Sequence, residues 1–449
     1  MSTFIRKHLL LIIILILVIP AYLLFAETNP KNAGRFPFML FLLAVDVYLW
    51  YSLKGKIKSL PVPWKVITGF IYWLPFISFI LLISISSVQN INLLRPSFIS
   101  YVFGIAVIIY FSKLLTVIFF LLADFYRIII YTFRHARAKK TGKPVQQGDR
   151  MTRGRFLRTM GLATGGLFFS GMVIGMVKWA HDFRVRHVNL NLPKLPFPFE
   201  GFRIVQISDL HLGSWASADP IEEAVEIIND LDADLVVFTG DLVNYSTKEA
   251  YRFRDALEKI QARHGVYAIL GNHDYGDYVN WPSESDKSEN MNALYRYFDE
   301  IGWKLLRNEN AIIEKDGDKL AVIGVENWSA NNRFPKLGNL EKAAGGTEDS
   351  PVRILLSHDP THWEHEVSKK YPGIDLTLSG HTHGFQFGVE LKHFRWSIAQ
   401  YVYKYWAGLY EKERAEKSQY LYVNRGLGMI GYPGRVGILP EITLLKLNS

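Results

Sequence analysis

Carboxylate, amide and imidazole side chains recur in five short motifs in the second half of the chain. Such groups are the ligands of zinc, iron and manganese in proteins. Their number exceeds what one ion needs and suits two ions joined by a bridging carboxylate. Two divalent ions about 3.5–4 Å apart can clamp an in-line displacement at phosphorus and acidify a bound water. The motifs are Asp209-Leu210-His211, Gly240-Asp241, Gly271-Asn272-His273-Asp274, His358 and Gly380-His381-Thr382-His383-Gly384.

The motifs follow apolar segments that are predicted to be strands. Helical patterns at Ile221–Leu231 and Lys248–Arg263 alternate with them, and this alternation indicates a layered α/β domain. Because ligand sites in open α/β sheets lie at the carboxyl ends of strands, the motif residues are expected to converge on one edge. The predicted strands are Phe202–Ser208, Leu235–Phe238, Val266–Leu270, Leu320–Gly324, Arg353–Ser357, Leu376–Ser379, Tyr420–Asn424 and Ile442–Leu447.

The ordered set of motifs resembles the calcineurin-like metallophosphoesterase family over roughly Phe202–Leu447. The segments Asn424–Gly428 and Pro440–Thr443 further resemble the membrane-anchored subgroup of that family. The resemblance implies a β-sandwich flanked by helices and a site for two divalent ions of manganese, iron or zinc. It also implies hydrolysis of phosphate esters.

The resemblance assigns a role to each motif residue. It implies that Asp241 bridges the two ions. It implies that His273 acts as a general acid, or hydrogen-bonds the phosphoryl oxygens, and that Asp274 orients it. Asp359 is expected to shape the turn around His358, and His362 and His365 are expected to be solvated. One ion is then held by Asp209, His211, Asp241 and His383, and the other by Asp241, Asn272, His358 and His381.

Composition excludes several other chemistries and divides the chain into two parts. The 449 residues include no cysteine, which excludes disulfides, cysteine-ligated zinc, iron–sulfur clusters and thiol catalysis. The net charge of +9 is the sum of +17 over residues 1–180 and −8 over residues 181–449. Because the basic residues border apolar stretches, they suit membrane orientation and anionic lipids. No nucleic-acid partner is expected.

Five long apolar stretches precede residue 180. A bilayer core requires about 20 apolar residues in a helix. Leu9–Phe25 alone could be a signal peptide, but no Ala-x-Ala site follows it, so it is expected to remain as a span. The domains predicted are a transmembrane region of about five helices at 1–180, a linker at 181–201, and a phosphoesterase domain at 202–449. The stretches are Leu9–Phe25, Phe36–Leu53, Val66–Val88, Phe98–Phe125 and Met160–Val177.

The distribution of basic residues predicts the orientation of these spans. Base-rich segments alternate with base-poor ones along residues 1–180, as the positive-inside bias requires. The protein is therefore expected in the inner membrane of the cell. Its N-terminus is expected in the cytoplasm, and its catalytic domain on the extracytoplasmic face. If Met160–Val177 were instead a buried helix of the soluble domain, the orientation would invert.

Two further features extend these predictions. Asp46 and Lys113 lie inside predicted spans and are expected to pair, because isolated charges there are costly. Tyr275–Asn290 and Phe385–Tyr410 are candidate walls of the substrate pocket. Phe385–Tyr410 holds nine aromatic residues with interleaved bases, and two readings stay open: a core hairpin, or a surface that dips into lipid headgroups.

The function expected is a membrane-anchored, dinuclear-metal phosphoesterase of the phosphodiesterase type. Its substrate is a phosphate monoester or diester, lipid-linked or close to the membrane. One alternative is a pyrophosphate hydrolase of the UDP-diacylglucosamine type, which the resemblance places on the cytoplasmic face, against the predicted orientation. The others are a membrane sensor or transport protein with a phosphoesterase output domain, and a metal-containing binding module without turnover.

Overall fold

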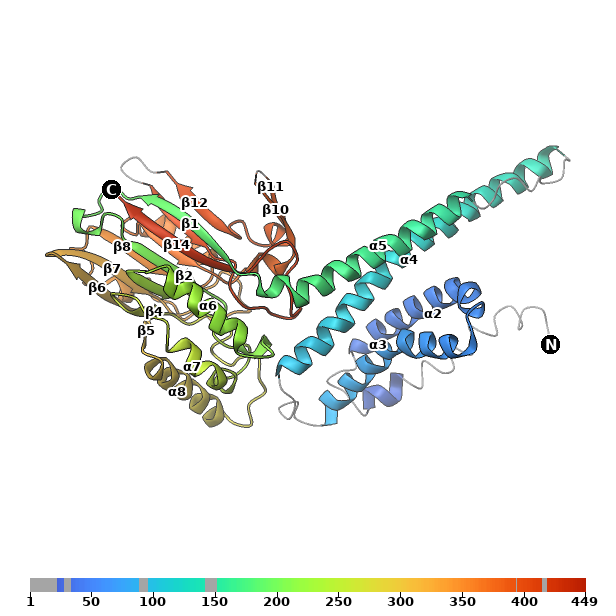
Figure 1. Cartoon of the computed structure of the whole chain (residues 1–449), viewed down its shortest axis with the longest axis horizontal. Coiled ribbons are helices and arrows are strands. Elements are labelled where there is room, and N and C mark those ends of the chain that lie inside the picture. Colours follow the sequence, from blue (N-terminus) through green and yellow to red (C-terminus); the bar gives the residue numbers. More distant parts are fainter. Residues whose placement is uncertain (1–21, 28–33, 89–95, 142–151, 393, 414–417) are drawn as a thin grey trace. The chain divides into compact units, whose positions relative to one another are not determined.

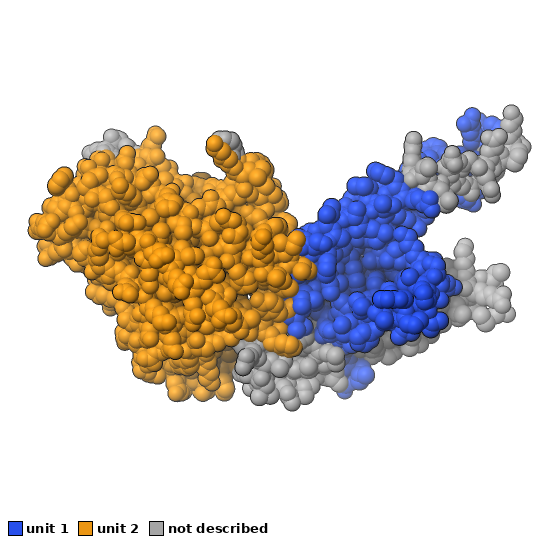
Figure 2. Space-filling view, viewed as in Figure 1, with its two compact units in different colours: residues 1–95, 102–171 blue, residues 96–101, 172–449 orange. Residues whose placement is uncertain are grey.

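The computed structural model describes residues 22–27, 34–88, 96–141, 152–392, 394–413 and 418–449. Within those residues the chain divides into two compact units, coloured separately in Figure 2. The described residues of one unit lie within 1–95 and 102–171, and those of the other lie within 96–101 and 172–449.

Four helices of the described residues are long and apolar enough to cross a membrane. Pro37 near the start of α2 and the bases Lys56 and Lys58 in its last turn suit the two ends of a helix. The predicted span Leu9–Phe25 lies, apart from its last four residues, outside the described part of the chain. The helices are α2 (Phe36–Lys58), α3 (Val62–Val88), α4 (Pro96–Thr141) and α5 (Thr152–Val177).

The predicted pairing of Asp46 and Lys113 is present in the first unit. Lys113 Nζ lies 2.5 Å from Asp46 Oδ1, and Asp46 is completely buried. Tyr110 donates its hydroxyl to Asp46 Oδ2 at 2.8 Å, and Lys113 Nζ lies 4.1 Å from the centre of the Tyr72 ring. The ion pair thus joins α2 to α4, because Asp46 belongs to α2 and Lys113 to α4.

Asp46→Asn and Lys113→Met should each destabilise the helical unit, because each leaves the other group buried without its counter-charge. The double variant should lose less free energy of unfolding than the two single variants lose together. The difference, the coupling energy, should be about 1 kcal/mol. Unfolding of the purified chain in detergent by SDS titration measures this. Lys56→Met, at an exposed position of α2, is the control. Strictly additive losses would contradict an energetic pair.

The second unit is built on two six-stranded sheets (Figure 1). The first sheet has the order β1-β14-β2-β3-β4-β5, in which β2 to β5 run parallel. Its strands are β1 (Arg184–Asn191), β2 (Arg203–Ile207), β3 (Leu235–Phe238), β4 (Val266–Ala268), β5 (Trp303–Leu305) and β14 (Glu441–Asn448).

The second sheet has the order β12-β13-β9-β8-β7-β6, and β10 and β11 form a separate hairpin. In the sheet, β7, β8, β9 and β13 run parallel, with antiparallel strands at both edges. The strands are β6 (Glu309–Lys315), β7 (Asp318–Gly324), β8 (Val352–Leu356), β9 (Leu376–Ser379), β10 (Gly388–Leu391), β11 (Phe394–Ser397), β12 (Gly408–Lys412) and β13 (Gln419–Val423).

Alternation of side chains along the strands fills three apolar layers. Ile204 of β2 and Val322 of β7 belong to one cluster, which lies between the two sheets. The neighbouring Val205 packs instead with helix residues on the outer face of the first sheet, and Ile323 does so on the outer face of the second. The fold is therefore a β-sandwich flanked by helices, as predicted. The helices are α6 (Asp219–Asp230), α7 (Arg254–Leu257), α8 (Glu284–Glu300), α9 (Leu340–Ala344) and α10 (Ser368–Lys370).

Three of the segments named in the sequence analysis have a different structure from the one expected. The helix predicted over Lys248–Arg263 is short, since only α7 and two 3₁₀ turns form there. The segment 181–201, expected to be a linker, contains β1, which pairs in parallel with β14 over eight residues. Half of the expected pocket wall Tyr275–Asn290 belongs to α8, where Ser283 caps the helix by accepting from the backbone N–H of Asp286.

Candidate metal centre

The motif residues lie in the loops that follow β2, β3, β4, β8 and β9, as the strand pattern predicts. Many of them have unusual backbone conformations. Five of the candidate ligands have positive φ angles between 43° and 73°. Side chains other than glycine rarely adopt this conformation, and such strain concentrates at functional sites. The five residues are Asp209, His211, Asp241, His381 and His383.

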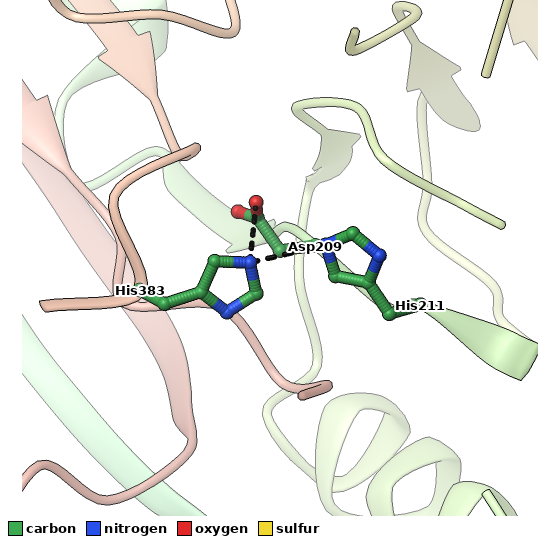
Figure 3. Close-up of side chains that lie close together, drawn as sticks. All are labelled: Asp209, His211 and His383. Carbon is green, nitrogen blue, oxygen red and sulfur yellow. Dashed lines mark hydrogen bonds and ion pairs between the residues drawn. The ribbon is translucent and has the colours of Figure 1, made fainter. Parts of the chain in front are cut away.

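One group of potential ligands comprises Asp209, His211 and His383 (Figure 3). His383 Nε2 lies 3.2 Å from Asp209 Oδ1 and 3.1 Å from His211 Nε2. All three side chains are buried, and one potential ligand atom of each lies within 4.8 Å of the others. Two imidazole nitrogen atoms and a carboxylate oxygen that converge in this way could hold one divalent ion.

A second group comprises Asp241, His358 and His381. Asp241 Oδ2 lies 3.2 Å from His358 Nε2 and also 3.5 Å from His211 Nε2 in the first group. The Asp241 carboxylate therefore lies between the two groups, where a bridging ligand would have to be. Gly271 makes this approach possible, because a Cβ atom there would stand 2.2 Å from Asp241 Oδ1.

Asn272 lines the same cavity as members of both groups. Its side-chain oxygen is buried and accepts no hydrogen bond, while its amide nitrogen donates to the Tyr278 hydroxyl at 2.9 Å. A buried amide oxygen without a donor is costly, and a cation would satisfy it. The donor set thus fits two divalent ions, and the residues present suit the group that the motifs imply.

Electrostatics favour cations in these loops. Burial lowers the pKa of His211 and of His381, so these rings stay neutral and keep a lone pair for a metal. Burial opposes ionisation of Asp209 and Asp241, but the neighbouring imidazoles outweigh it and hold both pKa values below the usual range. Burial opposes protonation of His358, but the Asp241 carboxylate outweighs it and raises the pKa of this ring to about 10. Two ionised carboxylates therefore face the imidazoles in a buried space.

His273 borders the same space. Its Nδ1 lies 2.8 Å from the carbonyl oxygen of Asn244, which fixes the proton on Nδ1 and leaves Nε2 free of that bond. Its backbone N–H donates to Asp241 Oδ1 at 2.8 Å, and its ring packs against Tyr278 with ring centres 4.3 Å apart. The side chain is thus oriented by a carbonyl group and a tyrosine ring.

The role of Asp274 in orienting His273 stays a prediction, and the bonds described for its carboxylate are with backbone groups. Its buried carboxylate accepts the backbone N–H groups of Asp241 at 2.9 Å, Leu242 at 2.8 Å and Gly271 at 2.9 Å. Burial, together with the nearby Asp241, raises the pKa of Asp274 to about 7. Asp274 therefore joins the loop after β3 to the loop after β4 and positions Asp241 through its backbone.

Comparisons with known proteins agree with this geometry. A family model described as calcineurin-like phosphoesterase matches residues 202–385, and one described as a probable calcineurin-like phosphoesterase transmembrane domain matches residues 32–179. YkuE of Bacillus subtilis, an uncharacterized metallophosphoesterase, is 30% identical over 311 residues, which cover 67% of this chain and 99% of YkuE. The chain belongs to the calcineurin-like phosphoesterase family.

Two other relatives show how far the likeness extends. A transmembrane protein with metallophosphoesterase domain from Danio rerio is 30% identical over 286 residues, which cover 62% of this chain. The match spans 60% of that relative's length. UDP-2,3-diacylglucosamine pyrophosphatase LpxG of Chlamydia trachomatis is 30% identical over 308 residues, which cover 59% of this chain and 88% of LpxG. This phosphoesterase is therefore membrane-associated, and its family uses divalent metal ions.

The phosphoesterase site opens into a cavity of about 290 Å³. Its walls include aromatic side chains that the motifs did not single out, among them Phe334, Tyr403 and Tyr432. Tyr403 Oη lies 2.9 Å from His381 Nε2. The aromatic composition of 385–410 pointed to Tyr403, whereas nothing in the sequence around Phe334 distinguishes it from a core residue.

The histidines near His358 have different environments. His362, predicted to be solvated, is buried: its Nδ1 lies 2.8 Å from Ser357 Oγ and its ring stacks on Trp328. That prediction is wrong because the chain after β8 turns His362 inward. His365 is exposed, as expected. Asp359 accepts the backbone N–H of Thr361 at 2.8 Å within the turn.

Proposed function

We propose that this membrane-anchored phosphoesterase hydrolyses a phosphate ester with two divalent ions bound at the Asp241 carboxylate. The position of Asp241 between two groups of buried ligands is the observation that carries the proposal. Asp209, His211, Asp241 and His383 would hold one ion. Asp241, Asn272, His358 and His381 would hold the other. When bound, such ions supply an acidified water and neutralise charge that develops on the phosphoryl group.

The remaining steps fall to residues of the chain. His273, with Nδ1 held by the Asn244 carbonyl, can donate a proton from Nε2 to the leaving oxygen when its ring is protonated. Asp274 keeps the Asp241 backbone in place. Phe334, Tyr403 and Tyr432 line the cavity beside these residues and can contact the substrate.

Chelation should abolish hydrolysis of bis(p-nitrophenyl) phosphate by the full chain in detergent, because no other described group in the site acidifies a water. Addition of manganese or zinc should restore it. Elemental analysis of the chain before and after chelation provides a readout independent of activity. A chain that hydrolyses the diester equally well after complete metal removal would contradict the proposal. Parallel assays with p-nitrophenyl phosphate decide between diester and monoester preference.

We further propose a lipid-linked or membrane-proximal substrate. Four candidate spans hold the chain in a membrane, and LpxG, whose name states a UDP-linked diacyl sugar substrate, is 30% identical. Hydrolysis of a UDP-diacylglucosamine-type pyrophosphate is the second candidate, favoured by that relative. The basic residues of 1–180 favour an inner membrane with the catalytic domain on the extracytoplasmic face.

A reporter fused after Lys178 tests the orientation. Alkaline phosphatase, which is active only outside the cytoplasm, should be active in this fusion, and green fluorescent protein should be dark when exported by the same route. The reverse result would place the site in the cytoplasm and would favour the second candidate substrate.

A further inference from the structure

The β10–β11 hairpin has its polar and apolar faces reversed relative to a hairpin that covers a protein core. In its register, Val389 pairs with Trp396 and Leu391 with Phe394, so these four side chains share one face. Val389, Leu391 and Phe394 are exposed, Leu391 by 65%. The polar pair Glu390 and Arg395 occupies the opposite face. Figure 1 shows the hairpin standing out from the two large sheets.

The polar face holds the hairpin against the protein. Glu390 accepts from Arg186 of β1 at 2.6 Å and from Arg425 at 2.7 Å. Arg395 donates to the carbonyl oxygen of Ala407 at 2.6 Å and packs over the Trp406 ring. Because Glu390 and Arg395 both bond to other parts of the protein, the opposite, apolar face of the hairpin points away from the protein.

The segment after the hairpin extends the exposed apolar surface. Tyr401 is 74% exposed and Val402 is 62% exposed, and the preceding Ile398 is exposed as well. The next residue, Tyr403, lines the cavity and packs edge-on against Phe385, which is itself exposed at the cavity. We call Val389, Leu391, Phe394, Ile398, Tyr401 and Val402 the hairpin surface. It therefore continues to the rim of the phosphoesterase site.

The end of a candidate span is bonded to the same region. Tyr432 donates its hydroxyl to the carbonyl oxygen of Met172, and the backbone N–H of Arg435 donates to that of Gly175 at 3.1 Å. A Cβ atom at Gly175 would stand 2.6 Å from the Arg435 carbonyl oxygen, so glycine permits this contact. Both Met172 and Gly175 belong to the candidate span Gly154–His181.

One loop joins that span to the hairpin. The backbone N–H of Gly388, the first residue of β10, donates to the Val436 carbonyl oxygen at 2.8 Å, and Val436 in turn donates to Gln386 at 2.7 Å. The chain that leaves the membrane, the loop 432–436 and the hairpin are thus one hydrogen-bonded structure in the second unit.

We propose that the hairpin surface inserts into the headgroup layer of the bilayer that α5 crosses, and so presents the cavity to a substrate in the same leaflet. Aromatic and aliphatic side chains are stable at that depth, and the exposed Lys392 at the turn can contact anionic headgroups. The bilayer contact is argued from the hairpin surface and from its bonds to the candidate span, without the proposed function. The benefit for a lipid-linked substrate rests on the proposed function.

The absence of cysteine allows a direct test of the contact. Single variants Leu391→Cys and Phe394→Cys in the full chain, labelled with an NBD fluorophore, are placed in nanodiscs of phosphatidylethanolamine and phosphatidylglycerol that contain doxyl-labelled lipid. Leu337→Cys and Phe197→Cys, at exposed apolar positions of the same unit, are the matched controls. Labels at 391 and 394 should be blue-shifted and quenched by the doxyl group, and the control labels should not be.

Two outcomes would overturn the proposal. Labels at 391 and 394 that are as solvated as the controls would show that the hairpin surface stays in water. Labels that are blue-shifted but not quenched by doxyl lipid would show that another protein surface, such as a second copy of this chain, covers the hairpin instead.

Turnover separates this proposal from the proposed function. The double variant Leu391→Ser with Phe394→Ser should lower kcat/KM for a short-chain glycerophosphodiester in the nanodisc by about tenfold. The reason is that the variant loses its contact with the membrane, and a tenfold change corresponds to about 1.4 kcal/mol. Its hydrolysis of soluble bis(p-nitrophenyl) phosphate should equal that of the unmodified chain. If the unmodified chain hydrolyses only the soluble ester, the lipid-linked substrate is wrong, and doxyl quenching still decides whether the hairpin meets the bilayer.

Discussion

Asp241→Ala should lower kcat/KM for an aryl phosphodiester by about a thousandfold or more, which corresponds to about 4 kcal/mol of transition-state stabilisation. The reason is geometric, because one carboxylate oxygen lies within 3.5 Å of imidazoles from both groups of potential ligands. Removal of this side chain would take a ligand from both of the proposed ions at once. The metal content of the purified variant should therefore fall together with activity.

The control for this variant is Asp299→Ala, at an exposed position near the end of α8. It should keep full activity and metal content. An Asp241→Ala protein that retains both ions and turns over normally would contradict the bridging role. A folded variant with both ions but no turnover would assign Asp241 to a different step, so metal analysis must accompany the rate measurement.

His273→Ala should lower kcat/KM by roughly 100- to 10,000-fold, the range typical of a lost general acid. The loss should depend on the leaving group. An ester of p-nitrophenol, which departs readily as an anion, should be affected least, and an alkyl ester should be affected most. Both ions should remain bound, because His273 lies beside the ligand groups without belonging to either.

His365→Ala is the matched control, since His365 is exposed. A plot of rate against leaving-group pKa measures the effect for both variants. Equal losses for p-nitrophenyl and alkyl esters would contradict proton donation and would favour a hydrogen bond from His273 to the phosphoryl oxygens. Loss of metal from His273→Ala would contradict both roles.

The sequence predicted the parts of the structure that depend on local pattern. Short apolar runs predicted β3 and β9 with their observed bounds. These strands belong to different sheets, and Asp241 after β3 lies close to His381 after β9. Asp46 and Lys113 were predicted to pair because ionisable groups within membrane spans are scarce and costly. These inferences need only periodicity and the cost of isolated charges.

Tertiary contacts decided what the pattern left open. β1 was missed because its alternating polar residues and nearby prolines resemble a linker, and only pairing with β14 makes it a strand. Asp274 follows His273 in sequence, yet it binds backbone N–H groups of two loops that fold next to it. His362 is buried by Trp328, and the motifs give no sign of that contact.

The short connection between α5 and β1 limits how far the catalytic domain can lie from the end of α5. Only six residues separate Val177 from Arg184, and three of these form a 3₁₀ turn. Even fully extended, six residues span at most about 20 Å. A domain on a long flexible leash could sweep through solution and sample distant molecules. A connection of six residues allows no such reach, so it limits how far the second, sheet-bearing unit can move from the end of α5.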